Sequence, residues 1–154
     1  MKRLFAFLVA AILAVLSFGA HAEERATEAE AQAMVRKAAT FYKKNGQDRT
    51  IAELVKSPGP FVDRDLYVTI YTLDGVLLAH INPKIVGKNL IELRDPDGKP
   101  FVRERVEAAR GSPSASGWQD YKYFNPVTKK VEPKRMYWER HDGLIFACGA
   151  YRKT

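Results

Sequence analysis

Few residues of this 154-residue chain have the type and spacing that catalysis needs. The sequence contains no Gly-x-Ser-x-Gly motif, no glycine-rich phosphate loop, and no His-x-x-x-His or Cys-x-x-Cys spacing for a metal site. The single cysteine, Cys148, ends the apolar run Leu144–Cys148, where a buried, unreactive thiol is more common than a nucleophile. A lone histidine such as His80 more often forms hydrogen bonds in a core or at its rim than acts as a base. We therefore expect no enzymatic activity, no metal and no cofactor.

Aromatic and hydroxyl-bearing residues alternate with aliphatic ones in the first expected strand. Val68 and Ile70 alternate with Tyr67, Thr69 and Tyr71, so one side can pack under a helix while the other is semi-polar and aromatic. Such a face suits a small polar ligand, because apolar walls exclude water and a few donors fix its orientation. On the residues alone, a solid core whose tyrosine hydroxyls reach solvent is an equally open interpretation.

The chain starts with the layout of a secretory signal peptide. Lys2 and Arg3 precede an apolar run from Leu4 to Phe18, and Gly19-Ala20-His21-Ala22 supplies the small residues of an Ala-x-Ala cleavage site. The run is shorter than the roughly 20 apolar residues of a spanning helix, which favours a cleaved signal over an uncleaved anchor. We expect residues 1–22 to be a signal peptide and residues 23–154 to form one domain exported to the periplasm.

Charge and cysteine content limit the function further. The sequence carries a formal charge of +7, but its Lys and Arg residues are scattered among carboxylates, which indicates a solvated surface rather than a nucleic-acid site. Export also removes nucleic acid as a partner, whereas a basic balance mildly favours anionic ligands. One cysteine cannot form an intramolecular disulfide, and the expected domain is long enough to fold around one core without it.

Turn and capping signals divide the expected domain into an α+β order of elements. Thr27 and Glu30 match a capping box that starts a long helix, and Gly46 is suited to end it. The helix has one apolar stripe, formed by Met34, Val35, Ala38, Phe41 and Tyr42. The later elements are expected, in chain order, as a helix at 50–56, strands at 66–72 and 76–81, a helix at 100–110, and strands at 118–124, 134–140 and 144–151. Short turns, among them Asp74-Gly75 and Asp142-Gly143, predict a five-stranded antiparallel sheet with the long N-terminal helix on one face.

Three ordered blocks of the sequence resemble the second subfamily of the single Cache domain. The blocks are Asp74-Gly75-Val76-Leu77-Leu78-Ala79-His80; Asn82-Pro83 with Val86-Gly87-Lys88-Asn89-Leu90; and Gly117-Trp118-x-x-Tyr121-x-Tyr123-x-Asn125-Pro126, running to Glu132-Pro133-Lys134-x-x-Tyr137 and Gly149-Ala150-Tyr151. The resemblance covers essentially all of the expected mature chain. It implies an extracytoplasmic sensor domain with a PAS-like sheet and a long N-terminal helix.

The resemblance also implies a ligand pocket between the sheet and the loops and helix that connect its strands. Carried onto this sequence, it gives seven candidate ligand-binding residues: Tyr71, His80, Trp118, Tyr121, Tyr123, Lys134 and Tyr137. Lys134 would supply a cation for a carboxylate, and the tyrosines would donate hydrogen bonds. Lys134 and Tyr137 are three residues apart, so on a regular strand they face opposite sides. A surface lysine with a packed stem is the alternative for Lys134.

The function implied is the binding and sensing of a small organic anion, such as a short organic acid, in the periplasm. The sequence encodes no signalling output, so we expect the domain to act through a membrane sensor kinase, a chemoreceptor or a transporter. Ligand binding would order residues 82–100 and so change which conformation of the domain is most populated when a partner binds it. The alternative is a structural or interaction module with a filled core, which could dimerise through the N-terminal helix. A cavity beside His80 and Tyr123 would distinguish the two, and a catalytic role rests only on His80.

Overall fold

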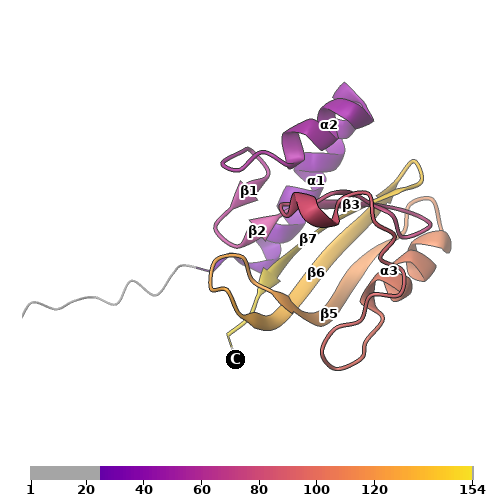
Figure 1. Ribbon diagram of the computed structural model, residues 1–154. Coiled ribbons are helices and arrows are strands. Elements are labelled where there is room, and N and C mark those ends of the chain that lie inside the picture. Colours follow the sequence, from indigo (N-terminus) through magenta and orange to yellow (C-terminus); the bar gives the residue numbers. More distant parts are fainter. Residues whose placement is uncertain (1–24, 154) are drawn as a thin grey trace, which may run out of the picture.

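A five-stranded antiparallel sheet forms the centre of the fold (Figure 1). The computed structural model describes residues 25–153, so the expected signal peptide lies outside the described residues. The strands are β3 (Thr69–Thr72), β4 (Leu77–Ala79), β5 (Ser116–Phe124), β6 (Val131–His141) and β7 (Leu144–Tyr151), and their order across the sheet is β4-β3-β7-β6-β5. All neighbouring strands pair antiparallel. The predicted α+β fold with a five-stranded PAS-like sheet is therefore confirmed.

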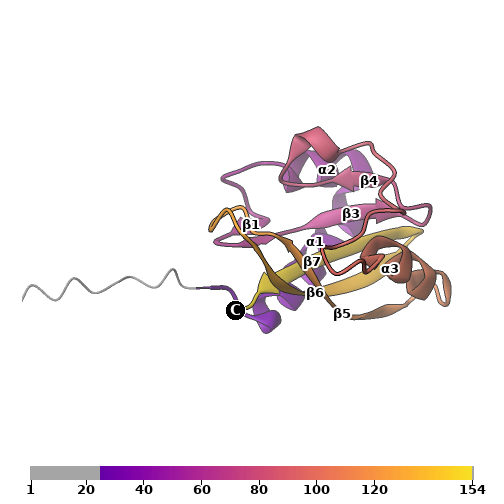
Figure 2. The ribbon, with the colours of Figure 1, turned by 60° about the horizontal axis from the view of Figure 1, so that its bottom comes forward.

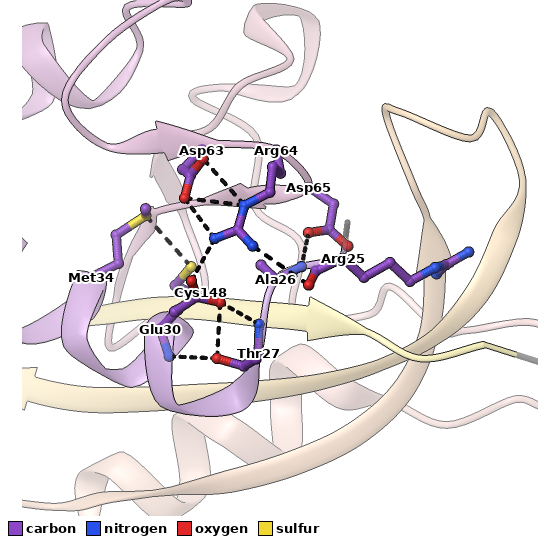
Figure 3. A network of polar contacts seen from close by, with 9 residues as sticks. All are labelled: Arg25, Ala26, Thr27, Glu30, Met34, Asp63, Arg64, Asp65 and Cys148. Carbon is purple, nitrogen blue, oxygen red and sulfur yellow. Dashed lines mark hydrogen bonds and ion pairs between the residues drawn. The ribbon is translucent and has the colours of Figure 1, made fainter. Parts of the chain in front are cut away.

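Helix α1 (Glu28–Asn45) covers one face of the sheet, as predicted. Its capping box is formed, with the Thr27 hydroxyl accepting from the Glu30 amide and the Glu30 carboxylate accepting from the Thr27 amide (Figure 3). Ala31, Val35 and Ala38 are buried against the sheet, because their spacing places them on one side of the helix. We call this side of the sheet the α1 face.

Helix α2 (Gln47–Leu54) begins earlier than the sequence predicted. Thr50 was expected at its start, but the buried Thr50 hydroxyl instead donates to the carbonyl of Gly46, one turn back. Gly46 has a φ of 78°, which a glycine adopts without strain and which lets the second helix follow the first directly. Gly46 thus ends α1 and also starts α2.

Helix α3 (Phe101–Arg110) and the chain before it cover the opposite face of the sheet, which we call the α3 face. A short 3-10 helix (Pro83–Ile85) interrupts the connection from β4. Figure 2 shows α3 close to β5, at the edge of the sheet farthest from β4. Both faces of the sheet are therefore covered, one by α1 and the other by α3 and the chain before it.

The expected strand at 66–72 is divided in two. Leu66–Tyr67 (β2) pairs with Val62–Asp63 (β1) as a separate two-stranded ribbon, and β3 starts only after Val68. The ribbon turns at Arg64, whose φ of 54° is unusual for a residue with a side chain. Arg64 is held there by ion pairs to Asp63 and to Glu30 at the start of α1 (Figure 3). Sequence patterning could not indicate this turn, because it contains no glycine or proline.

Replacing Thr27 by alanine should lower the free energy of unfolding by about 1 kcal/mol, because the helix start loses the side-chain acceptor of its capping box. Denaturant titration followed by circular dichroism measures the loss. Thr40→Ala is the control, since the Thr40 hydroxyl lies on the exposed side of the same helix and bonds only to the carbonyl of Arg36. Equal losses in the two variants would show that the capping box contributes nothing specific.

Candidate functional site

Five of the seven predicted site residues gather on the α3 face. Tyr71 on β3 and Tyr121 on β5 belong to the cluster of side chains that packs under α3, with Tyr123 against it. Lys134 on β6 stands directly opposite Tyr121 in the strand register, so both side chains leave the same face. His80, just after β4, lies with its ring 6.4 Å from that of Tyr123.

Trp118 and Tyr137 lie on the other side of the sheet. They face each other across β5 and β6, with ring centroids 4.9 Å apart, and Tyr137 belongs to the core under α1. The Tyr137 hydroxyl donates to Glu139 at 2.8 Å. Lys134 and Tyr137 thus face opposite sides of the sheet, as predicted. Lys134 shares its face with Tyr71, Tyr121 and Tyr123, and Tyr137 does not. The alternative of a surface position for Lys134 is wrong, because its exposure is 1 %.

The Lys134 ammonium is enclosed by two tyrosines. Its Nζ donates to the Tyr151 hydroxyl at 3.3 Å and lies 4.0 Å from the centre of the Tyr67 ring. Within residues 25–153, no carboxylate lies within ion-pair distance of it. Burial lowers the pKa of Lys134 to about 7, with a smaller effect of Arg105 in the same direction and an opposing one of Asp65. The group is therefore a buried amine that can change charge near neutral pH.

Tyr67 and Tyr151 were not among the predicted site residues. The Tyr151 hydroxyl gives its proton to the carbonyl of Phe124 at 2.7 Å, so in the contact between the two hydroxyls, at 3.1 Å, Tyr67 is the donor. Tyr67 shares its strand parity with Tyr71, and this was the one sequence signal that could have identified it.

His80 is neutral and has a defined tautomer. Its Nδ1 accepts a hydrogen bond from the amide of Asn82 at 2.8 Å, so the proton of the neutral ring is on Nε2. Burial and then the charge of Lys134 lower the pKa of His80 to about 4. No residue between 25 and 153 accepts from Nε2, which leaves this N–H as a free donor.

Three tyrosine hydroxyls on the α3 face also lack partners. Those of Tyr71, Tyr121 and Tyr123 form no hydrogen bond within the described part of the chain. Burial raises the pKa of Tyr123 to about 12 and that of Tyr121 further above its usual value, so both hydroxyls are protonated donors. These free donors on a largely apolar face indicate a place where a polar ligand can bind.

A pocket of about 370 Å³ opens beside His80 and Tyr123. It is lined by Tyr67, His80, Ile81, Asn82, Ile85, Tyr123, Phe124 and Pro126. The walls are largely apolar, with the His80 and Tyr123 donors among them. This combination of an apolar enclosure and a few polar groups suits a small molecule.

Arg105 is a further buried cation that the sequence interpretation missed. It lies on α3 within the apolar stripe of Phe101, Val102, Val106 and Ala109, and its exposure is 2 %. The available signal was its position four residues after Phe101, which places a charged residue on the apolar side of the helix. Its guanidinium carbon lies 5.3 Å from the centre of the Tyr71 ring and 5.7 Å from that of Tyr121.

Cys148 is buried, as expected, and burial raises the pKa of its thiol to about 12. Its Sγ contacts Sδ of Met34 at 3.9 Å under α1. Across residues 25–153, no three His, Cys, Asp or Glu side chains are placed to hold a metal ion. In the same range, no helix has the length and apolar character needed to cross a bilayer.

Comparison with solved structures shows the same fold in bacterial sensor domains. The chain resembles a methyl-accepting chemotaxis protein from Vibrio parahaemolyticus RIMD 2210633 (23% identity, TM-score 0.66, covering 80% of this chain and 86% of that one). It also resembles a Cache chemosensory domain described for its recognition of carboxylic acids (23% identity, TM-score 0.69, 81% and 92%). A third is the periplasmic sensor domain of a chemotaxis protein (21% identity, TM-score 0.61, 81% and 90%).

No curated protein matches the sequence. A family model does: that of single Cache domain 2 matches residues 11–146, which is most of the chain and includes every residue of the site except Tyr151. The match covers more than half of the chain, and the protein therefore belongs to the single Cache domain 2 family.

Proposed function

We propose that this protein binds a short organic acid on the α3 face and acts as a periplasmic sensor through a partner protein. The observation that carries the proposal is the buried ammonium of Lys134, which has no carboxylate partner among the described residues. A buried charge is costly without a counter-charge, and a ligand carboxylate would provide one. The resemblance in fold to a domain described for carboxylic acid recognition supports this class of ligand.

The surrounding donors suit a carboxylate as well. The free Nε2–H of His80 and the hydroxyl of Tyr123 border the same pocket, and neither carries a negative charge at neutral pH. A carboxylate has two oxygens with several lone pairs, so it can accept from more than one donor at once. The Lys134 ammonium lies 4.0 Å from the centre of the Tyr67 ring, and Tyr67 is part of the wall of this pocket. Ile81 and Ile85 exclude water from its apolar side.

Ligand occupancy would reach a partner through the segment between β4 and α3. Ile81, Asn82 and Ile85 form one wall of the pocket, while the amide of Gly87 donates to Leu77 and that of Leu90 to Gly75. The segment thus borders the pocket at its start, and the residues that follow are anchored to β4 and its turn. If the ligand binds more tightly when this wall is in one of its conformations, it increases the fraction of molecules in that conformation.

The partner would be a membrane sensor kinase, chemoreceptor or transporter, met after export by the proposed signal peptide at residues 1–22. The filled-core alternative, an interaction module that dimerises through α1, requires the space beside His80 and Tyr123 to be occupied by side chains. The pocket of about 370 Å³ at that place favours binding of a small molecule instead.

Isothermal titration calorimetry of the purified domain against acetate, propionate, lactate, pyruvate and succinate tests the proposal. We expect at least one acid to bind. If none binds at millimolar concentration, the proposed function is wrong.

Lys134→Met should weaken binding of the tightest acid by at least about tenfold, because it removes the buried cation and keeps the length of the side chain. The melting temperature should stay the same or rise, since an unpaired buried charge is replaced by an apolar group. Lys122→Met on the neighbouring strand is the control, because Lys122 is exposed and paired with Asp97. Equal affinities of the two variants would exclude Lys134 from the site.

Affinity should fall as the pH rises above about 7. Below that pH the Lys134 amine is already charged and binds the carboxylate directly. Above it the amine must take up a proton when the carboxylate binds, so the affinity falls by up to about tenfold per pH unit. His80 stays neutral throughout this window, because its pKa is lowered to about 4. Calorimetry in buffers of different ionisation enthalpy measures the proton uptake. Uptake that persists in Lys134→Met would assign it to another group.

Tyr123→Phe and Tyr137→Phe form a matched pair, since each removes one hydroxyl from an opposite face of the sheet. We expect Tyr123→Phe to weaken binding by about fivefold, because the free Tyr123 donor borders the pocket. Tyr137→Phe should leave affinity unchanged, since its hydroxyl bonds to Glu139. The reverse result in the same titrations would place the ligand on the α1 face.

A further inference from the structure

Arg105 has more hydrogen-bonding capacity than the chain around it uses. Its Nη2 donates to Oε1 of Gln119 at 3.1 Å. Its Nε and Nη1 are shielded from solvent and have no hydrogen-bond partner within residues 25–153. A guanidinium remains charged in folded proteins, so it cannot relieve this deficit by losing a proton.

The contacts that Arg105 does make are with rings. Tyr71, Phe101 and Tyr121 surround the guanidinium carbon at 5.3 Å, 5.9 Å and 5.7 Å from their centres. Ring faces attract a cation, but they do not accept the in-plane N–H groups that a carboxylate accepts. No carboxylate of the described chain forms an ion pair with Arg105. The arrangement holds the cation in place and leaves its donors free.

Arg105 and Lys134 flank the same side chain. Tyr121 lies within reach of the Arg105 guanidinium, and Lys134 stands directly opposite Tyr121 on the next strand. The Tyr121 hydroxyl has no hydrogen-bond partner in the described chain. The α3 face therefore buries two cations on either side of one tyrosine, and within the described chain neither forms an ion pair with a carboxylate. Like charges placed together in a medium of low polarity repel, which makes two bound negative charges more favourable than one.

We infer that the ligand carries two anionic groups, one bound by Lys134 and the other by Arg105, and that it is a short dicarboxylate. The inference rests on the proposed function and specifies its ligand. Two separated cations on the two sides of Tyr121 match a molecule with an anion at each end. The planar guanidinium also fits a carboxylate in its plane.

An open pocket of about 390 Å³ at the β5 edge connects Arg105 to the protein surface. Its lining includes Arg105, Gln119, Lys99 and Trp138. Gln119, at 9 % exposure, holds Arg105 with its Oε1 while its Nε2 donates to the carbonyl of Phe101. Gln119 is thus a positioning residue, because it fixes the guanidinium to the start of α3.

Calorimetric titrations of the whole purified domain at about pH 7 test the inference, with malonate, succinate and glutarate compared with acetate, propionate and butyrate. One dicarboxylate should bind at least about tenfold more tightly than every monocarboxylate. Arg105→Met should remove this preference by weakening the dicarboxylate at least about tenfold, while monocarboxylate affinity changes less than about twofold. Arg105→Lys should restore part of the preference, because it keeps the charge.

Arg110→Met is the matched control, since Arg110 carries the same charge on the same helix but is exposed and paired with Asp74. It should retain the wild-type preference. Equal binding of mono- and dicarboxylates by the wild-type protein would overturn the inference and leave the proposed function intact, and this comparison needs no variant to fold. A uniform loss for both classes in Arg105→Met would also overturn it, as would a lowered melting temperature with unchanged selectivity. Absence of binding to all six acids would instead remove the proposed function.

Discussion

An ammonium group buried without a counter-ion is costly, and the α3 face is arranged around one. Lys134 is held by the ring of Tyr67 and the hydroxyl of Tyr151, which offset part of the cost of its burial. Gly149 makes room for it, because a Cβ at that position would lie 2.9 Å from Cε of Lys134. The proposed site would therefore be preorganised, since the lysine is already desolvated and held by its neighbours without a ligand.

The two faces of the sheet differ because alternate residues of β6 serve different purposes. Tyr137 turns toward α1 and takes part in a solid interior with Val35 and Phe146. Lys134 turns toward α3. On that face the hydroxyls of Tyr71, Tyr121 and Tyr123, and the Nε and Nη1 of Arg105, have no hydrogen-bond partner among the described residues. A shift of β6 by one residue would exchange these roles, so the long β5–β6 and β6–β7 pairings protect the site as much as the fold.

Local signals in the sequence predicted most of the fold and part of the site. The capping box at Thr27 and the turn at Asp142-Gly143 act through neighbouring residues, so the sequence alone was enough to place α1, β6 and β7. The face occupied by Lys134 depends on which residue of β5 it meets, and this register is a tertiary property. Arg105 was missed because a charged residue in an amphipathic helix is usually solvated, and only packing shows that α3 turns this one inward.

The pocket is connected to the start of α1 by a short chain of contacts. Phe124 and Pro126 line the pocket, and Asn125 between them donates through Nδ2 to Glu132 at 2.8 Å. Glu132 in turn accepts two hydrogen bonds from Arg25, at 2.8 Å and 2.9 Å, directly before the helix. Because the Arg25 side chain is the first cause of the lowered pKa of Glu132, to about 2, this pair stays ionised at any physiological pH. Arg25 lies two residues before Thr27, the N-cap of α1. Under the proposed function, a ligand that moves the pocket wall would therefore act on a charged contact just before the long helix, and a partner that binds there would meet a different surface in the occupied and empty states.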